Sequence, residues 1–227
     1  MGVLGDHTKI FSYNKIIKTK KINRYELFNS YFFDILNIKN IIIEKKLTSK
    51  LLLKEYKIPE NYIIININKT KKWGKVSLPI LEWNNLLKLV LIKTKFNIVL
   101  VGSENEYSDS IKLIHNIPKK KIYNFTGKTN FAELCYVFQN AKKIVTTDSG
   151  IMHLSGLFNK KIIAVFTFSD PNIYCTPNDT IVLFNKVIHC QPCVKNPCPG
   201  SDNYPPICFN KYKCNSGIGI KQIFDLI

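Results

Sequence analysis

A short segment near residue 150 combines the residue types of an anion-binding turn. It reads Thr146-Thr147-Asp148-Ser149-Gly150-Ile151-Met152-His153-Leu154. The apolar run before it predicts a buried strand, and the apolar run over residues 151–158 predicts a helix. Free N–H groups and the positive end of the helix dipole attract an anion where such a strand stops. An ordinary turn with Asp148 or Ser149 capping the helix fits the same residues, so both interpretations stay open.

The elements that must position this turn alternate between strands and helices. Strands are predicted over residues 62–67, 96–101, 121–125, 142–145 and, as the last one, 161–166. Helices are predicted over residues 79–92, 107–115, 131–140 and 151–158. This order predicts an α/β fold with a Rossmann-like, doubly wound parallel sheet. Ligands of such sheets bind beyond the carboxyl ends of the strands, where residues 68–75, 103–106, 126–129, 148–153 and 169–170 lie.

Other segments are less regular. The apolar face of the helix over residues 79–92 can use Leu81, Leu86, Leu87, Val90 and Leu91. Before residue 61, the patterns predict helices over residues 25–36 and 48–56 and an edge strand over residues 39–46. Gly102 and Gly127 each end a strand, which predicts tight turns and nothing sharper. The chain has neither the glycine pattern of a dinucleotide-binding turn nor that of a P-loop.

The charge of the chain favours anionic partners. Its 227 residues, enough for one large or two small domains, include 33 lysines and arginines against 16 acidic residues, a net charge of +17. Arg24 is the only arginine. Because arginine forks are the usual readers of base edges, their scarcity argues against nucleic acid as a partner.

Hydropathy predicts a cytoplasmic protein. No apolar run reaches the roughly 18–20 residues that span a bilayer, and the first residues lack the apolar core of a signal peptide. Lysines can still hold the chain peripherally at the inner face of the cytoplasmic membrane.

Five of the seven cysteines crowd the C-terminal tail, namely Cys190, Cys193, Cys198, Cys208 and Cys214. Their spacing differs from the paired Cys-x-x-Cys motifs of a zinc ribbon. We therefore predict reduced, structural thiols and no metal, with a small zinc site as the alternative.

Three motifs, in this order, resemble the C-terminal half of glycosyltransferase family 9, the lipopolysaccharide heptosyltransferases. They are residues 101–106 (Val-Gly-Ser-Glu-Asn-Glu), residues 125–134 (Phe-Thr-Gly-Lys-Thr-Asn-Phe-Ala-Glu-Leu) and residues 147–154 (Thr-Asp-Ser-Gly-Ile-Met-His-Leu). Asp170-Pro171 with Pro177, and the tail over residues 189–199, also match. The resemblance covers roughly residues 61–214.

The resemblance implies the GT-B arrangement, in which an N-terminal domain binds the acceptor glycolipid and a C-terminal domain binds the nucleotide-sugar. It implies three parts: residues 1–60 as a remnant of the acceptor domain and a linker, 61–185 as the Rossmann-like nucleotide-sugar-binding domain, and 186–227 as a Cys-rich tail and C-terminal segment. Residues 2–14 resemble the closing strands of the acceptor domain. The family's catalytic aspartate has no match, so we expect donor binding with slow or no transfer, and the catalytic residues are unknown.

At the phosphate end of the donor, the resemblance assigns four residues of the turn. Ser149 and Gly150 would supply N–H groups to the pyrophosphate, with glycine allowing close approach. His153 would add a donor, unless it is a half-buried or capping histidine. Asp148 would orient the turn or meet sugar hydroxyls.

The remaining donor-binding residues come from three other loops. Lys75, or else Lys72, would contact the phosphates, although either can be an ordinary solvated lysine. Glu106 would accept hydrogen bonds from the ribose hydroxyls, and Thr129 would hold the adenine edge through its backbone. Trp73 and Trp83 are expected to pack rather than stack on the base. Thr167 stands where the family has a glycine, which would reshape the sugar end.

The predicted function is transfer of a sugar from a nucleotide-sugar, ADP-heptose, to a lipopolysaccharide core glycolipid acceptor, without a cofactor. The alternative is a non-catalytic nucleotide-binding remnant of such an enzyme. A basic nucleic-acid module organised by the cysteine tail would require stoichiometric zinc and a steeply salt-dependent affinity.

Overall fold

The computed structural model describes residues 58–67, 77–158, 160–175, 180–184, 189, 191–192 and 213–227, and the backbone of residues 2–3, 9–12 and 15–18. The helices and strand predicted over residues 25–56 lie outside the described residues. So do the loop with Lys72, Trp73 and Lys75 and four of the five tail cysteines.

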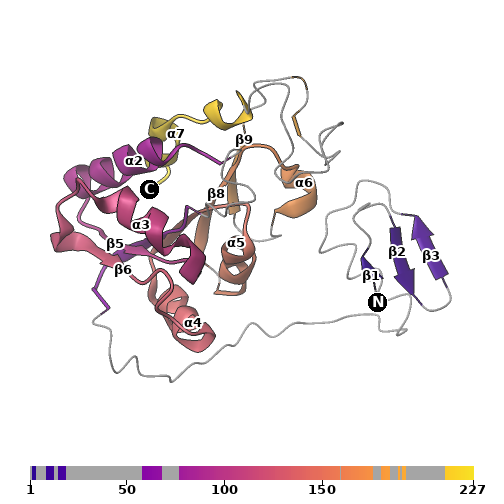
Figure 1. The fold of residues 1–227 in the computed structure, drawn as a ribbon, viewed down its shortest axis with the longest axis horizontal. Coiled ribbons are helices and arrows are strands. Elements are labelled where there is room, and N and C mark those ends of the chain that lie inside the picture. The colour runs from indigo at the N-terminus through magenta and orange to yellow at the C-terminus, as the bar shows by residue number, and fades with distance from the viewer. Residues whose placement is uncertain are drawn as a thin grey trace.

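The centre of the fold is a six-stranded sheet in which every neighbouring pair is parallel. Its spatial order is β6-β5-β4-β7-β8-β9, and Figure 1 shows the chain winding through it. The strands are β4 (Tyr62–Ile65), β5 (Asn97–Leu100), β6 (Ile122–Asn124), β7 (Lys143–Thr147), β8 (Lys161–Phe166) and β9 (Thr180–Phe184). Counted from β4, this is the strand order 3-2-1-4-5-6 of the Rossmann fold. The predicted doubly wound α/β sheet is confirmed.

The sixth strand corrects the sequence analysis, which made residues 161–166 the last strand. β9 adds to β8 in parallel register, with Ile163 opposite Ile181. The helix between them, α6 (Pro171–Tyr174), has four residues. A helix of one turn has no 3.6-residue periodicity to detect, so the alternation of strands and helices was missed there.

The helices lie on both faces of this sheet. They are α2 (Ile80–Lys93), α3 (Tyr107–Ile114), α4 (Phe131–Asn140), α5 (Gly150–Ser155) and α7 (Ile220–Phe224), with 3-10 turns η1 (Glu104–Glu106), η2 (Lys119–Lys121), η3 (Gly156–Phe158) and η4 (Lys213–Ser216). α7 packs beside α2 (Figure 1). Within the described part of the chain, no helix is long and apolar enough to cross a membrane.

Alternate residues of β4 point to opposite faces of the sheet, as in any strand, and pack against different helices. Ile63 and Ile65 lie in the cluster that includes the buried residues of α2, α3 and α7. Tyr62 and Ile64 pack instead with the buried residues of α4. Because both faces are covered, every side chain of β4 is apolar or aromatic and buried.

One prediction for α2 was wrong in detail. Leu81, which we placed on the apolar face, is 64% exposed. Trp83 is buried instead, together with Leu86, Leu87 and Val90 at helical spacing. The expectation that Trp83 is a packing residue is confirmed.

The first residues form a separate antiparallel sheet of three short strands. They are β1 (Gly2–Val3), β2 (Lys9–Ser12) and β3 (Lys15–Lys18). Residues 10 and 17 lie opposite each other in the pairing of β2 with β3.

Candidate functional site

The turn between β7 and α5 keeps the predicted strand-turn-helix form. β7 runs two residues further than predicted, to Thr147, and α5 begins at Gly150. Ser149 occupies the N-cap position with an extended backbone, but its side chain does not cap the helix. Its Oγ lies instead 3.2 Å from Thr146 Oγ1. A turn capped by the Ser149 side chain, one of the two forms of the alternative interpretation, does not describe this geometry, and capping by Asp148 stays a prediction.

The space beside Gly150 is open. Residue 150 is exposed, and a Cβ atom built on it would meet no heavy atom within 4 Å. The first N–H groups of an α-helix have no acceptor within the helix. A ligand can therefore approach the start of α5 without displacing a side chain at Gly150. His153, four residues into the segment that starts at Gly150, is half-buried.

Asn66 lies immediately after β4 and was missed by the sequence analysis. It is 2% exposed, and its Nδ2 donates to the Val101 carbonyl at 2.9 Å. Its Oδ1 accepts from Thr146 Oγ1 at 3.2 Å. An amide in an otherwise apolar β-branched run was the available signal, because a buried polar side chain must find hydrogen-bond partners.

Glu106 is buried and only half satisfied. Its side chain is 7% exposed, and Oε2 accepts from Ser103 N at 2.7 Å and from Ser103 Oγ at 2.9 Å. Oε1 is buried and has no hydrogen-bond partner among the described residues. Leaving a buried carboxylate oxygen unpaired is costly, so a ligand hydroxyl that donates to Oε1 would stabilise the site.

Two glycines bring the loop of Glu106 against the loop after β6. Gly127 has a φ of +69°, and a Cβ atom there would lie 2.8 Å from Glu104 Cα. Gly127 N donates to the Gly102 carbonyl at 2.9 Å. The expectation of tight turns and nothing sharper was too weak, because only glycine allows this close backbone approach.

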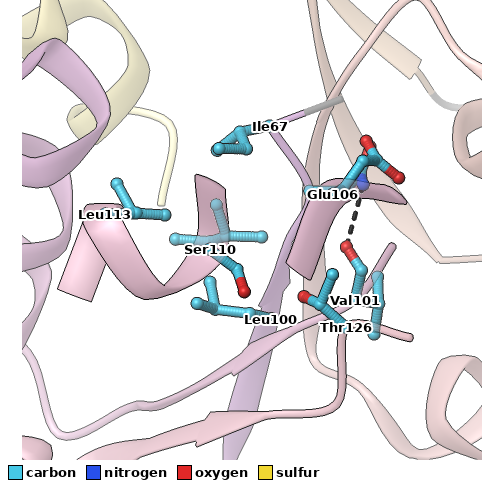
Figure 2. Close-up of a pocket in the computed structure, with 9 residues that line it drawn as sticks. Ile67, Leu100, Val101, Glu106, Ser110, Leu113 and Thr126 are labelled. Carbon is cyan, nitrogen blue, oxygen red and sulfur yellow. Dashed lines mark hydrogen bonds between the residues drawn. The ribbon is translucent and has the colours of Figure 1, made fainter. Parts of the chain in front are cut away.

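A small pocket lies where β4 and β5 end (Figure 2). Its lining residues are Ile65, Asn66, Ile67, Leu100, Val101, Glu106, Ser110, Leu113 and Thr126. The cavity measures about 10 Å³, the space of roughly one water molecule. A dashed line in Figure 2 reaches the Val101 carbonyl, which accepts the hydrogen bond from Asn66 Nδ2 at 2.9 Å. The pocket thus lies between two buried polar side chains of this edge, Asn66 and Glu106.

The loop after β6 also reaches this edge of the sheet. Thr129 is partly buried and precedes Asn130, which caps α4 by accepting from Glu133 N at 2.9 Å. Lys128 Nζ lies 5.7 Å from the centroid of the Tyr107 ring in α3, a cation–π distance. This contact connects the loop of Thr129 to the helix that follows Glu106.

The end of β8 carries further buried polar groups. Ser169 Oγ, like Thr147 Oγ1 at the end of β7, is buried without a hydrogen-bond partner in the described part of the chain. Asp170 caps α6 by accepting from Asn172 N at 3.0 Å. Gln191 of the tail is buried and donates through Nε2 to the Thr167 carbonyl. The start of the tail is therefore held against the loop that follows β8.

The described cysteines show no sign of a metal centre. Cys135 and Cys214 are buried, and burial raises the pKa of the Cys135 thiol. Among the residues that the structure describes, no three histidine, cysteine or acidic side chains gather as metal ligands. Cys190, Cys193, Cys198 and Cys208 lie outside them, so a metal-free tail stays a prediction.

The chain is similar to known glycosyltransferases. Residues 37–202 match the family model of glycosyltransferase family 9 (heptosyltransferase). Lipooligosaccharide heptosyltransferase 2 of Campylobacter jejuni serotype O:2 is 25% identical over 213 residues, covering 81% of this chain and 62% of that protein. The Haemophilus influenzae protein of the same name is 28% identical over 85 residues, 36% of this chain and 25% of that protein.

Solved structures share the fold. A glycosyltransferase family 9 structure from Veillonella parvula has a TM-score of 0.55 at 18% identity, over 73% of this chain and 44% of that one. E. coli ADP-heptose lps heptosyltransferase II has a TM-score of 0.52 at 20% identity, over 57% and 40%. The chain thus spans less than two thirds of these relatives. Since the family model covers most of its residues, the chain belongs to glycosyltransferase family 9, the heptosyltransferase family.

Proposed function

We propose that the described sheet binds the donor of a heptosyltransferase reaction, ADP-heptose, whose sugar is transferred to a lipopolysaccharide core glycolipid. The observation that carries the proposal is Glu106: Ser103 fixes its Oε2, while its Oε1 is buried and has no hydrogen-bond partner among the residues that the structure describes. A vicinal diol such as that of ribose donates hydrogen bonds to a carboxylate. Family membership supports adenosine diphosphate as the nucleotide, and so does one structural relative, the E. coli heptosyltransferase WaaC, which was solved with ADP.

The phosphates would lie at the turn between β7 and α5. As the bond between the sugar and the diphosphate breaks, negative charge grows on the departing phosphate oxygen. N–H groups of Ser149 and Gly150 would receive this charge, beside the open space at Gly150. His153 would add a donor, and Asp148 would orient the turn or meet the sugar hydroxyls.

Two further contacts complete the proposed donor site. Lys75, or else Lys72, would neutralise the phosphates, and backbone groups at Thr129 would hold the adenine edge. The acceptor hydroxyl must lose its proton as the new glycosidic bond forms. In this proposal the described residues bind the donor, and none of them is assigned the role of the base that takes this proton.

The proposed acceptor also implies a place of action. A lipopolysaccharide core glycolipid is membrane-bound, so the chain would work in the cytoplasm at the inner face of the cytoplasmic membrane. Its net charge of +17 favours an anionic lipid surface.

Isothermal titration of the purified chain against ADP, UDP, GDP and their sugars tests the proposal. We expect ADP and ADP-heptose to bind and UDP and GDP to bind at least about tenfold more weakly, a difference of about 1.4 kcal/mol. Equal affinity for the three diphosphates, or none for ADP, would contradict the assignment. Transfer to a core acceptor, assayed by mass spectrometry, separates an enzyme from a non-catalytic nucleotide-binding protein.

A further inference from the structure

Asn66 occupies the topological switch point of the sheet. β4 is paired with β5 on one side and with β7 on the other. The loop after β5 leads to Glu106, whereas the loop after β7 leads to Ser149 and Gly150. Asn66 follows β4 directly, and its side chain is hydrogen-bonded to Val101, just after β5, and to Thr146 of β7. We propose that Asn66 is a positioning residue that sets the spacing between the nucleoside and phosphate halves of the donor site, an inference that rests on the donor binding proposed above.

On the β5 side, Asn66 is connected to Glu106 by a short path. Its Nδ2 donates to the Val101 carbonyl at 2.9 Å. Val101 precedes Gly102 and Ser103, and Ser103 holds Glu106 Oε2 through two hydrogen bonds. The bond from Asn66 therefore fixes the start of the loop that presents Glu106.

On the β7 side, Asn66 is connected to the phosphate turn. Its Oδ1 accepts from Thr146 Oγ1 at 3.2 Å, and Ser149 Oγ lies 3.4 Å from the same oxygen. Ser149 Oγ is also 3.2 Å from Thr146 Oγ1. The Ser149 side chain is thus held toward Asn66 instead of capping α5.

The amide suits this position for a chemical reason. A primary amide carries a donor and an acceptor on one planar group, so it can bond to two neighbours of opposite kind. At 2% exposure, these bonds are shielded from bulk solvent, so losing one leaves a buried polar group without its partner. Backbone pairing alone does not fix this spacing. The pairing of β4 with β7 ends at Ile65 opposite Val145, and after it a single backbone hydrogen bond runs from Asn66 N to the Val145 carbonyl.

Spacing matters for a ligand that contacts both halves at once. When a second contact forms within an already bound molecule, its strength depends on an effective concentration that falls if the sites are misplaced. Loss of the Asn66 side chain should therefore weaken the binding of ADP, which contacts both halves of the site. The binding of adenosine or of pyrophosphate, each of which contacts one half, should weaken much less.

The test compares three variants. Asn66→Ala removes both sets of bonds, and Thr146→Val removes only the hydroxyl on the β7 side with little change of shape. Asn84→Ala is the matched control, since Asn84 Nδ2 also donates to a backbone carbonyl, that of Leu113 at 2.6 Å, but on α2. Binding of ADP, adenosine and pyrophosphate is measured by NMR titration, which detects weak ligands.

We expect the dissociation constant of ADP to rise at least about tenfold in Asn66→Ala and less in Thr146→Val, with adenosine and pyrophosphate changed by no more than about twofold. The control should bind all three ligands as the parent does. A parallel loss for the three ligands, or unchanged ADP affinity, would overturn the positioning role.

Hydrogen exchange distinguishes this failure from failure of the proposed function. A parent chain that does not bind ADP refutes the function, whereas exchange requires no ligand. Asn66→Ala should speed exchange of the amides of residues 103–106 and 149–152, and Asn84→Ala should not. Unchanged exchange in either segment would show that Asn66 does not hold it and would overturn the inference.

Discussion

Gly102 and Glu106 are packed so closely that a Cβ atom on residue 102 would lie 2.9 Å from Glu106 Oε2. The same atom would lie 3.2 Å from Thr126 Cγ2. Both neighbours line the pocket of Figure 2. The absence of a side chain at residue 102 is therefore what leaves room for the Glu106 carboxylate in the position where Ser103 holds it.

Gly102→Ala should weaken ADP binding by displacing this carboxylate. We expect a loss of about threefold to tenfold, because the flexible end of Glu106 can move aside while its hydrogen bonds to Ser103 are weakened. Calorimetric titration gives the affinity. Gly127→Ala is the contrasting variant: its φ of +69° and a contact of 2.8 Å to backbone should reduce the free energy of unfolding by about 1–3 kcal/mol. Unchanged ADP affinity in Gly102→Ala would mean that the position of Glu106 is unimportant.

Glu106→Gln should reduce ADP affinity at least about tenfold, since a charged acceptor for the ribose hydroxyls is lost. Glu104→Gln, on the same 3-10 turn but exposed, is the control and should bind normally. Titration with 2′,3′-dideoxy-ADP identifies the contact: this analogue should bind the parent and Glu106→Gln equally. If Glu106→Gln weakens both nucleotides to the same extent, Glu106 does not read the ribose.

Gly150→Val should abolish ADP binding without unfolding the chain. A Cβ atom at residue 150 would meet no heavy atom of the protein within 4 Å, so the added side chain would extend into the space that the phosphates need. We expect a melting temperature within a few degrees of the parent and no detectable ADP binding, with Gly150→Ala intermediate. Normal affinity in Gly150→Val would exclude phosphate from this turn.

Tyr62 should make the fold sensitive to high pH. Its hydroxyl donates to the Val137 carbonyl at 2.7 Å, and burial, with a smaller effect of neighbouring Tyr136, raises the pKa of Tyr62. A raised pKa of an acid means that the neutral phenol stabilises the folded state below the unfolded pKa of about 10, and that this stability is lost as pH rises further.

Tyr62→Phe checks this origin. At pH 7 the variant should lose about 1 kcal/mol of unfolding free energy with the hydrogen bond. Above about pH 10 its stability should fall less steeply than that of the parent. Urea unfolding at a series of pH values measures both effects, and identical slopes would mean that another group causes the alkaline loss.

The purified chain should retain no tightly bound zinc. The tail cysteines lack zinc-ribbon spacing, and Cys214, the tail cysteine that the structure describes, is buried. Elemental analysis of protein prepared without chelator decides the question. One zinc per chain would show instead that the tail is a metal site.

The sequence predicted most of this sheet because its central strands, β4, β5, β7 and β8, are short and largely buried. A run such as Tyr-Ile-Ile-Ile, predicted between two helical segments of the sequence, leaves few alternatives to a buried parallel strand. The same reasoning predicted a ligand site at the carboxyl edge of the sheet, since parallel strands all end at that edge. Glu106 and the turn at Ser149 do lie at strand ends on this edge.

The contacts within the site were harder to predict. Asn66 and Thr146 are 80 residues apart in the chain, and hydrophobic periodicity contains no information about which distant polar groups will pair. The packing of Gly127 on Glu104 has the same character. Such pairs become visible only when the strands are placed side by side.

The position of β7 also has a consequence for the order of folding. β4, β5 and β6 are neighbours both in sequence and in the sheet, so they can assemble early, whereas β7 must return to β4 across a long intervening segment. The bond between Thr146 and Asn66 forms only after that return. Substitutions at these two residues should therefore speed unfolding and leave the folding rate almost unchanged.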